Sequence, residues 1–210
     1  VFTVHRLDRA TSGVLIFGLN SEAARALTTQ FERREVAKTY HAIVRGYTDD
    51  SGTIDIPLKE PYDRIATPAE ADENKPAQEA ITKYETLVQS ELPISAGKYP
   101  TSRFSFVRLT PQTGRRHQIR RHLKHIAHPI IGDIKHGDNR VNQLIETEFG
   151  IRRLMLVASE LQVSHPSTGE AMVLSALAGE DFQSARQLLQ LGVTPPADRL
   201  TRERTTVQRE

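Results

Sequence analysis

Apolar positions along the chain recur mainly with the two-residue alternation, or as the short continuous runs, that are typical of β-strands. Turn-forming or charged residues separate these segments. The pattern predicts strands at residues 14–19, 38–46, 52–58, 80–88, 104–109, 154–163 and 171–177. Because strands outnumber helices and do not alternate with them, we expect an α+β fold with one mixed, mostly antiparallel sheet and flanking helices, rather than a doubly wound fold.

Three segments instead have apolar residues three or four positions apart, which is the spacing of amphipathic helices. They predict a helix at about 21–35, a second that follows Thr113-Gly114 and ends at His128-Pro129, and a third at 180–191. Asn20 or Ser21 would cap the first helix, because their side-chain oxygens accept a hydrogen bond from a free N–H of the first turn.

The composition is typical of one folded domain. The 210 residues, of which 38% are hydrophobic, suffice for one buried core. We predict a single domain over residues 1–192, with a surface loop at about 60–79, and then a polar, disordered tail at 193–210. Cysteine is absent, which excludes a disulfide scaffold and a thiol nucleophile. No apolar run approaches the length of a membrane span, so we expect a cytoplasmic protein with no membrane partner.

Positive charge is concentrated in one part of the chain. The stretch from Leu92 to Gly132 contains eight of the 28 Lys and Arg residues and none of the 26 acidic ones. Segregation of this kind marks a surface that faces an anionic partner, most commonly a nucleic acid. The alternative is that these side chains lie on different faces and are simply solvated. With 6% aromatic residues and no tryptophan, extensive base stacking is not expected.

A second concentration of polar chemistry lies near the N-terminus, in His5-Arg6-Leu7-Asp8-Arg9-Ala10-Thr11-Ser12-Gly13. Asp8 stands between two arginines, and nearby cations favour the charged form of a carboxylate. An ionised carboxylate on a tight loop can act as a nucleophile at the anomeric carbon of a sugar. A surface ion pair is the alternative interpretation.

The predicted second helix carries several cations. Arg116, Arg120 and Lys124 are four positions apart, so on one helix they would share a face and attract an anion. The start of this segment, at Gly114-Arg115, would offer free backbone N–H groups to a phosphate.

Four histidines follow closely and suggest a competing metal site, namely His117, His122, His125 and His128. No acidic residue or cysteine within the stretch completes a tetrahedral set, so we expect no metal there.

Five motifs together resemble the RluA branch of the pseudouridine synthases, in the right order from residue 1 to 177. They are His5-Arg6-Leu7-Asp8 with Thr11-Ser12-Gly13, Lys38-x-Tyr40-x-Ala42 ending at Gly46, Gly114-Arg115-x-His117-Gln118-Ile119-Arg120, His128-Pro129-Ile130-Ile131-Gly132-Asp133 and His165-Pro166-x-Thr168-Gly169-Glu170. Members of this branch have a further N-terminal strand with an Asn-Lys-Pro-like element, which is absent here, so the chain resembles a truncated member.

The resemblance implies a pseudouridine synthase core with a central RNA-binding cleft, and an isomerase that needs no cofactor. It makes Asp8 the catalytic aspartate, Arg120 its basic partner, and Tyr40 the residue that stacks on the target uracil. Arg6 would fill the space that the flipped nucleotide leaves. The basic residues of the second helix would hold the RNA backbone; they are Arg115, Arg116 and Lys124.

The preferred RNA is suggested by resemblance alone. Gly97-Lys98-Tyr99-Pro100-Thr101, the run Arg120–His125 and His136-Gly137-Asp138 resemble the members that modify uridine 65 in the acceptor arm of tRNA. We therefore expect a monomeric tRNA-modifying enzyme without an obligate protein partner, with a ribosomal RNA synthase of the same branch as the alternative.

Two other classes of protein stay open at this point. One is a non-catalytic RNA-binding module, which would leave Asp8 far from Tyr40 and Arg120. The other is a glycoside hydrolase, for which Asp133 or Asp138 would have to supply a second catalytic carboxylate.

Overall fold

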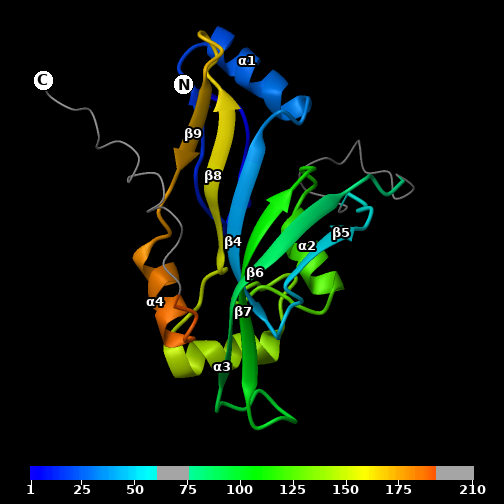
Figure 1. Ribbon diagram of the computed structural model, residues 1–210, viewed down its shortest axis with the longest axis vertical. Coiled ribbons are helices and arrows are strands. Elements are labelled where there is room, and N and C mark those ends of the chain that lie inside the picture. Colours follow the sequence, from blue (N-terminus) through cyan, green and yellow to red (C-terminus); the bar gives the residue numbers. More distant parts are fainter. Residues whose placement is uncertain (61–75, 193–210) are drawn as a thin grey trace, which may run out of the picture.

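The computed structural model describes residues 1–60 and 76–192 (Figure 1). Its main sheet has the strand order β2-β8-β4-β7-β6-β5, with β9 paired to β8. The strands are β2 (Ser12–Gly13), β4 (Ala37–Arg45), β5 (Ser51–Asp55), β6 (Ile81–Leu92), β7 (Ser102–Pro111), β8 (Leu156–Ser164) and β9 (Ala171–Ser175). All neighbours in this sheet are antiparallel except β2 and β8. The expected α+β fold is confirmed.

One detail of the predicted sheet is wrong. Residues 14–19 do not form a continuous strand, because only β3 (Phe17–Gly18) does, and it pairs with β1 (Phe2–Thr3) in a separate two-stranded sheet. Val14 and Ile16 are apolar because they pack against small clusters of buried residues beside the first helix. Apolar alternation here indicates packing rather than strand pairing.

Four helices flank the sheet in the described part of the chain. They are α1 (Ser21–Glu32), α2 (Gln118–His125), α3 (Asn139–Phe149) and α4 (Glu180–Leu188). Asn20 caps α1 as predicted, since its side chain accepts a 2.8 Å hydrogen bond from the backbone N–H of Ala23. The second helix is shorter than predicted, and α3 was not predicted at all.

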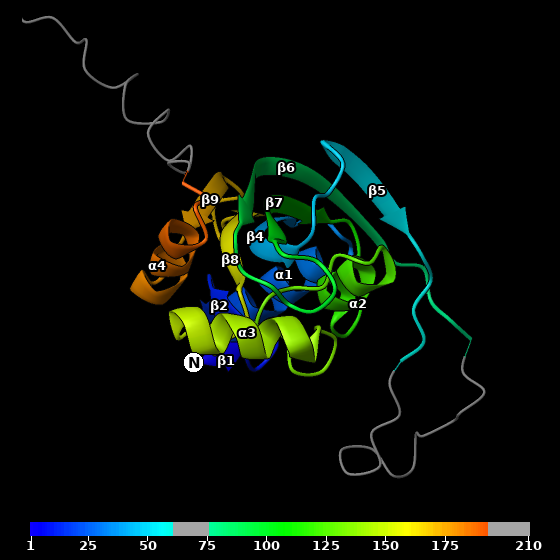
Figure 2. The ribbon, with the colours of Figure 1, turned by 90° about the horizontal axis from the view of Figure 1, so that it is seen from below.

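The central strands separate two faces, which different helices cover. Tyr40 pairs with Leu109 across β4 and β7, and its side chain lies on the face that carries α2. The next residue on β4, His41, points to the opposite face, where its ring stacks on Phe106 and the Phe106 ring meets Phe182 of α4 at 6.3 Å between centroids. Figure 2 shows α1 and α2 on one side of these strands and α4 on the other. Helices α1 and α2 therefore flank the same side of the sheet.

The predicted domain boundary at residue 192 stays a prediction, because the tail at 193–210 lies outside the described residues. Most of the predicted surface loop, from 61 to 75, does so as well. Within 1–60 and 76–192, no helix is both long enough and apolar enough to cross a membrane.

Candidate active site

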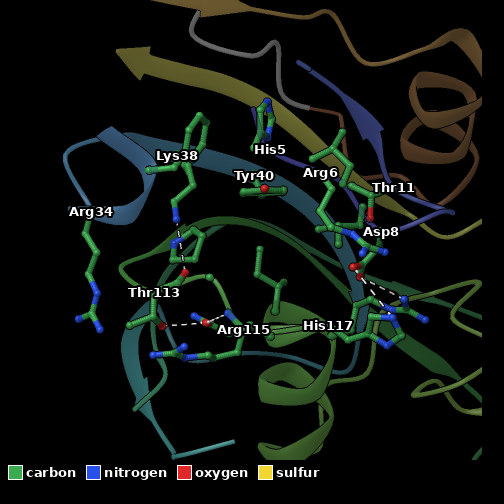
Figure 3. Close-up of a pocket in the computed structure, with 18 of the residues that line it drawn as sticks. His5, Arg6, Asp8, Thr11, Arg34, Lys38, Tyr40, Thr113, Arg115 and His117 are labelled. Carbon is green, nitrogen blue, oxygen red and sulfur yellow. Dashed lines mark hydrogen bonds and ion pairs between the residues drawn. The ribbon is translucent and has the colours of Figure 1, made fainter. Parts of the chain in front are cut away.

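A cavity of about 410 Å³ lies on the α1 and α2 side of the sheet (Figure 3). Its wall combines the N-terminal loop, the end of α1, β4 and the segment from Pro111 to Arg120. Five of the seven predicted site residues line it, namely Arg6, Asp8, Tyr40, Arg115 and Arg120. The other two, Arg116 and Lys124, are not part of its wall. The convergence expected of Asp8, Tyr40 and Arg120 is present.

Asp8 sits in a turn that the sheet holds in place. The backbone N–H of Thr11 donates to the carbonyl of Asp8 at 2.9 Å, and Ser12 and Gly13 then pair with β8. A Cβ at Gly13 would come within 2.0 Å of the Ala158 carbonyl oxygen, and φ there is +123°. Only glycine allows the loop to approach β8 this closely. The Asp8 side chain is 24% exposed and faces the cavity.

Arg120 connects Asp8 to a second, deeply buried carboxylate. Its Nη1 donates to Oδ2 of Asp8 at 3.1 Å, while Nε and Nη2 donate to the two oxygens of Asp133 at 2.7 and 2.8 Å. Asp133 also accepts the backbone N–H groups of Lys135 and His136. Because Asp133 holds the guanidinium through two hydrogen bonds, the Nη1–H group of Arg120 points at Asp8.

The electrostatics of this trio favour the charged forms of Arg120 and Asp133. Hydrogen bonding to Asp133 raises the pKa of Arg120 above its ordinary value. Burial acts to raise the pKa of Asp133, but the Arg120 hydrogen bond and the His136 backbone N–H outweigh it, and the pKa is lowered. Neither of the two aspartates proposed as the second acid of a hydrolase lines the cavity: Asp133 is buried against Arg120, and Asp138 caps α3.

The prediction that Arg116, Arg120 and Lys124 share one helical face is wrong. Helix α2 begins only at Gln118, so Arg116 precedes it, while Arg120 is buried and Lys124 is exposed. Gln118 marks this start, since its side-chain oxygen accepts the backbone N–H of Arg115 and so holds the preceding turn. Arg120 is compensated by carboxylates of its own chain and is not available to an RNA phosphate.

Tyr40 and Arg115 take up different places on the cavity wall. Tyr40 follows an irregularity in the pairing of β4 with β8, and its ring lies in the cavity (Figure 3). Burial, with the negative charge of Asp8, raises the pKa of Tyr40 to about 12, so its phenol stays protonated at neutral pH. Arg115 donates from Nε to the Glu79 carbonyl at 3.0 Å, and Arg6 is exposed.

The four histidines do not meet at one point. His122 is buried between Thr82 and the Ile56 carbonyl, His128 contacts the Arg45 carbonyl, and His125 is exposed. In the part of the chain that the structure describes, no group of three His, Cys, Asp or Glu side chains is placed to hold a metal ion. His117 alone of the four reaches the cavity wall, 4.0 Å from Asp8.

Comparison with known proteins identifies the family to which the chain belongs. Residues 1–125 match the family model described as RNA pseudouridylate synthase. The chain belongs to this family. It is 54% identical over 176 residues to tRNA pseudouridine synthase C of Pectobacterium carotovorum, which covers 84% of this chain and 46% of that protein. It is 49% identical over 201 residues to the Yersinia pestis protein of the same name, covering 95% of this chain and 78% of that one.

The chain thus spans about half the length of the first of these relatives and over three quarters of the second. Among solved structures, human RNA pseudouridylate synthase domain containing 4 superposes with a TM-score of 0.67 at 28% identity, covering 90% of this chain and 76% of that one. The cavity wall does contain a second carboxylate, Glu32 at the end of α1. Family membership, rather than the number of carboxylates, therefore excludes the hydrolase interpretation.

The sequence analysis did not foresee three of the residues that support the cavity wall. It considered Asp133 only as a possible second acid, and it quoted Gln118 and His136 only as parts of motifs. The sequence did contain a signal for Asp133, because it is the first acidic residue after a stretch with eight Lys and Arg residues and is therefore a candidate ion-pair partner for one of them. Nothing local indicated that His136 would contact His117.

Proposed function

We propose that this chain converts a uridine of tRNA into pseudouridine, with Asp8 as the catalytic carboxylate. The observation that carries the proposal is the Asp8 carboxylate, held by Arg120 in a cavity that Tyr40 also lines. The names of the bacterial relatives support tRNA as the substrate, and resemblance supports uridine 65 of the acceptor arm as the target.

The reaction moves the ribose from N1 to C5 of the same uracil, so it requires neither a group donor nor a redox cofactor. Asp8 breaks the bond between N1 and C1′, by attack at C1′ or by another route through the sugar. The uracil turns within the cavity and bonds to C1′ through C5. The Tyr40 ring, neutral at physiological pH, offers a flat surface on which the uracil stacks.

A uridine inside a stacked helix cannot reach Asp8, so the nucleotide has to flip out, which costs a few kcal/mol. We assign to Arg6, which is exposed and lines the cavity, the role of filling the space that the nucleotide leaves. Backbone contacts offset the cost of flipping. We assign these contacts to Arg115 at the cavity wall, and to Arg116 and Lys124 beyond it.

The test is to incubate the protein, and separately the variant Asp8→Asn, with bulk tRNA and with ribosomal RNA, and to map new pseudouridines. We expect a pseudouridine in the acceptor arm of tRNA with the wild-type chain. We expect none with Asp8→Asn, which should still bind tRNA because the basic residues are unchanged.

Each other outcome overturns a defined part of the proposal. Modification of ribosomal RNA alone would refute the substrate and retain the reaction. An active Asp8→Asn variant would refute the mechanism. RNA binding without any pseudouridine would favour the non-catalytic module.

A further inference from the structure

The reaction contains a proton transfer that Asp8, Arg120 and Tyr40 leave unassigned. When C5 has bonded to C1′, C5 still carries its hydrogen, and N1 is joined to C6 by a double bond. The C5–H bond then breaks, its electron pair forms the C5–C6 double bond, and the C6–N1 π pair moves to N1, which takes up a proton. A base must therefore lie close to C1′, the carbon at which Asp8 acts, because C5 is now bonded to it.

We infer that His117 is this base and that His136 holds it in the required tautomer. This inference rests on the proposed function and extends it. His117 Nε2 lies 4.0 Å from Oδ1 of Asp8, and the imidazole is part of the cavity wall, where Figure 3 shows it beside Asp8. C5 is attached directly to C1′ at this stage, so its hydrogen lies within reach of groups that adjoin Asp8.

The other titratable side chains near this point are poor candidates. Arg120 remains protonated, and its guanidinium is bound to two carboxylates. Tyr40 has a pKa of about 12 and so carries its proton at neutral pH. His5 reaches the cavity but uses Nε2 to accept the backbone N–H of Ile16 at 3.0 Å. Among these side chains, His117 alone combines a neutral ring with a nitrogen that faces the cavity near Asp8.

A second histidine sets the protonation pattern of the first. His117 Nδ1 lies 2.9 Å from His136 Nε2, so one hydrogen is shared between the two rings. Burial lowers the pKa of His136 to about 4, so this ring is neutral at physiological pH and can accept. When His117 donates from Nδ1, its Nε2 carries a lone pair toward the cavity, which is the form that a base requires.

A chain of contacts connects the His117–His136 pair to Asp8. Asp133, which fixes Arg120, also accepts the backbone N–H of His136 at 2.9 Å. Asp8, Arg120, Asp133, His136 and His117 therefore form a closed ring of contacts.

The backbone of His117 indicates that this placement is imposed by the fold. Its φ of 54° lies in the left-handed region, which costs free energy for a residue other than glycine, and its side chain makes no capping hydrogen bond to α2. Conformations of this kind cluster at functional sites, where the surrounding structure maintains them. Here the conformation directs the ring to Asp8 and His136.

The charges that face His117 determine the pH range of such a base. Burial lowers its pKa below 6.5; Asp8 opposes this effect, while Arg120, Lys135 and Arg116 reinforce it. The neutral ring is thus the dominant form at physiological pH. Its partner His136 carries no charge under these conditions.

The decisive variant is His117→Asn, because asparagine tolerates a left-handed backbone and the fold should be retained. Under single-turnover conditions with saturating enzyme, we expect pseudouridine formation to slow by about 100-fold or more, the usual contribution of a general base. tRNA carrying deuterium at C5 should then react more slowly than ordinary tRNA, because C5–H cleavage has become rate-limiting. The wild-type rate should fall as the pH drops through the pKa of His117, below 6.5, and the variant should lack this dependence.

Two further variants complete the experiment. His125→Asn removes an exposed imidazole from the same helix and should leave rate, isotope effect and pH profile unchanged. His136→Phe keeps a ring but removes the hydrogen bond to Nδ1, and should slow the same step by less than His117→Asn does. Circular dichroism and tRNA affinity report whether each variant is folded.

The inference is overturned if His117→Asn reacts at the wild-type rate, or reacts slowly with neither an isotope effect nor a changed pH profile. The proposed function fails separately, if the wild-type chain forms no pseudouridine at all.

Discussion

Asp133→Asn is the substitution that best tests how Asp8, the carboxylate proposed to be catalytic, is positioned. It replaces one carboxylate oxygen by an amide nitrogen and hardly changes the volume. Arg120 then loses its buried counter-charge and one of its two acceptors on this residue, and keeps one neutral acceptor there besides the contact to Asp8. The Asp133 side chain is 1% exposed, so water cannot replace what is lost.

The magnitude follows from the contacts. Removing one partner of a buried ion pair costs about 3–5 kcal/mol. Asparagine keeps one carbonyl oxygen, and a neutral hydrogen bond contributes about 1 kcal/mol where a charged one contributes about 1.5–3 kcal/mol. We therefore expect the free energy of unfolding to fall by about 2–4 kcal/mol. Pseudouridine formation should fall as well, because Arg120 no longer presents a fixed N–H to Asp8.

The measurement is urea unfolding followed by circular dichroism, with Asp181→Asn as the matched control. Asp181 also accepts two hydrogen bonds from one arginine, Arg153, at 3.0 and 2.8 Å, but its side chain is 54% exposed. Exposed ion pairs contribute up to about 1 kcal/mol, and salt weakens them further. Equal losses in the two variants, or a loss below about 1 kcal/mol with normal activity in Asp133→Asn, would refute the role assigned to the buried pair.

Three further results are expected. Burial lowers the pKa of His41 to about 4, so about 3 kcal/mol of stability that is present above pH 6.5 is lost as the pH falls toward 4. In urea unfolding, the free energy of unfolding of His41→Phe should therefore differ less between pH 7 and pH 4 than that of the wild type. An unchanged difference would argue against this assignment. Lys124→Ala should reduce the slope of log affinity for tRNA against log salt concentration by about one, and an unaltered slope would show that Lys124 meets no phosphate. Gly132→Ala would place a Cβ 1.8 Å from the Arg153 carbonyl oxygen, so we expect thermal unfolding to show a loss of more than about 2 kcal/mol in stability. At Gly150, an added Cβ meets nothing within 4 Å, so Gly150→Ala should cost only the left-handed backbone penalty of about 1–2 kcal/mol. Equal costs in the two variants would contradict the clash at Gly132.

Local signals account for the parts of the fold that could be predicted. Asn20 is followed by apolar residues at helical spacing, and α1 begins where this pattern places it. The same kinds of signal were present for α3, where Asp138 caps the helix, Val141 and Ile145 are buried, and Gly150 ends it in a left-handed conformation. That helix was predictable in principle, because its cap, spacing and terminal glycine are all adjacent in sequence.

Distant contacts account for the parts that could not be predicted. The start of α2 depends on Gln118, whose side chain donates to the Ile81 carbonyl and to Thr82 on β6. A pattern of cations four positions apart contains no information on that anchor, so the shared face of Arg116, Arg120 and Lys124 was a reasonable but wrong inference. In the same way, the pairing of Arg120 with Asp133 follows from the path of the chain and not from spacing within a helix.

The loop that carries Asp8 leaves the ribosome well before the residues that hold it in place. Arg120 follows Asp8 by 112 positions, and Arg153, whose Nη2 donates to the Ser12 hydroxyl, follows Ser12 by 141 positions. Strand β8, which pairs with this loop, also comes late. Contacts of such separation form slowly, and a domain folds as a unit once its partners have emerged. On the proposed function, a ribosome-bound chain that ends before β8 should not modify RNA, because the loop that carries Asp8 lacks its pairing partner until synthesis has passed residue 164.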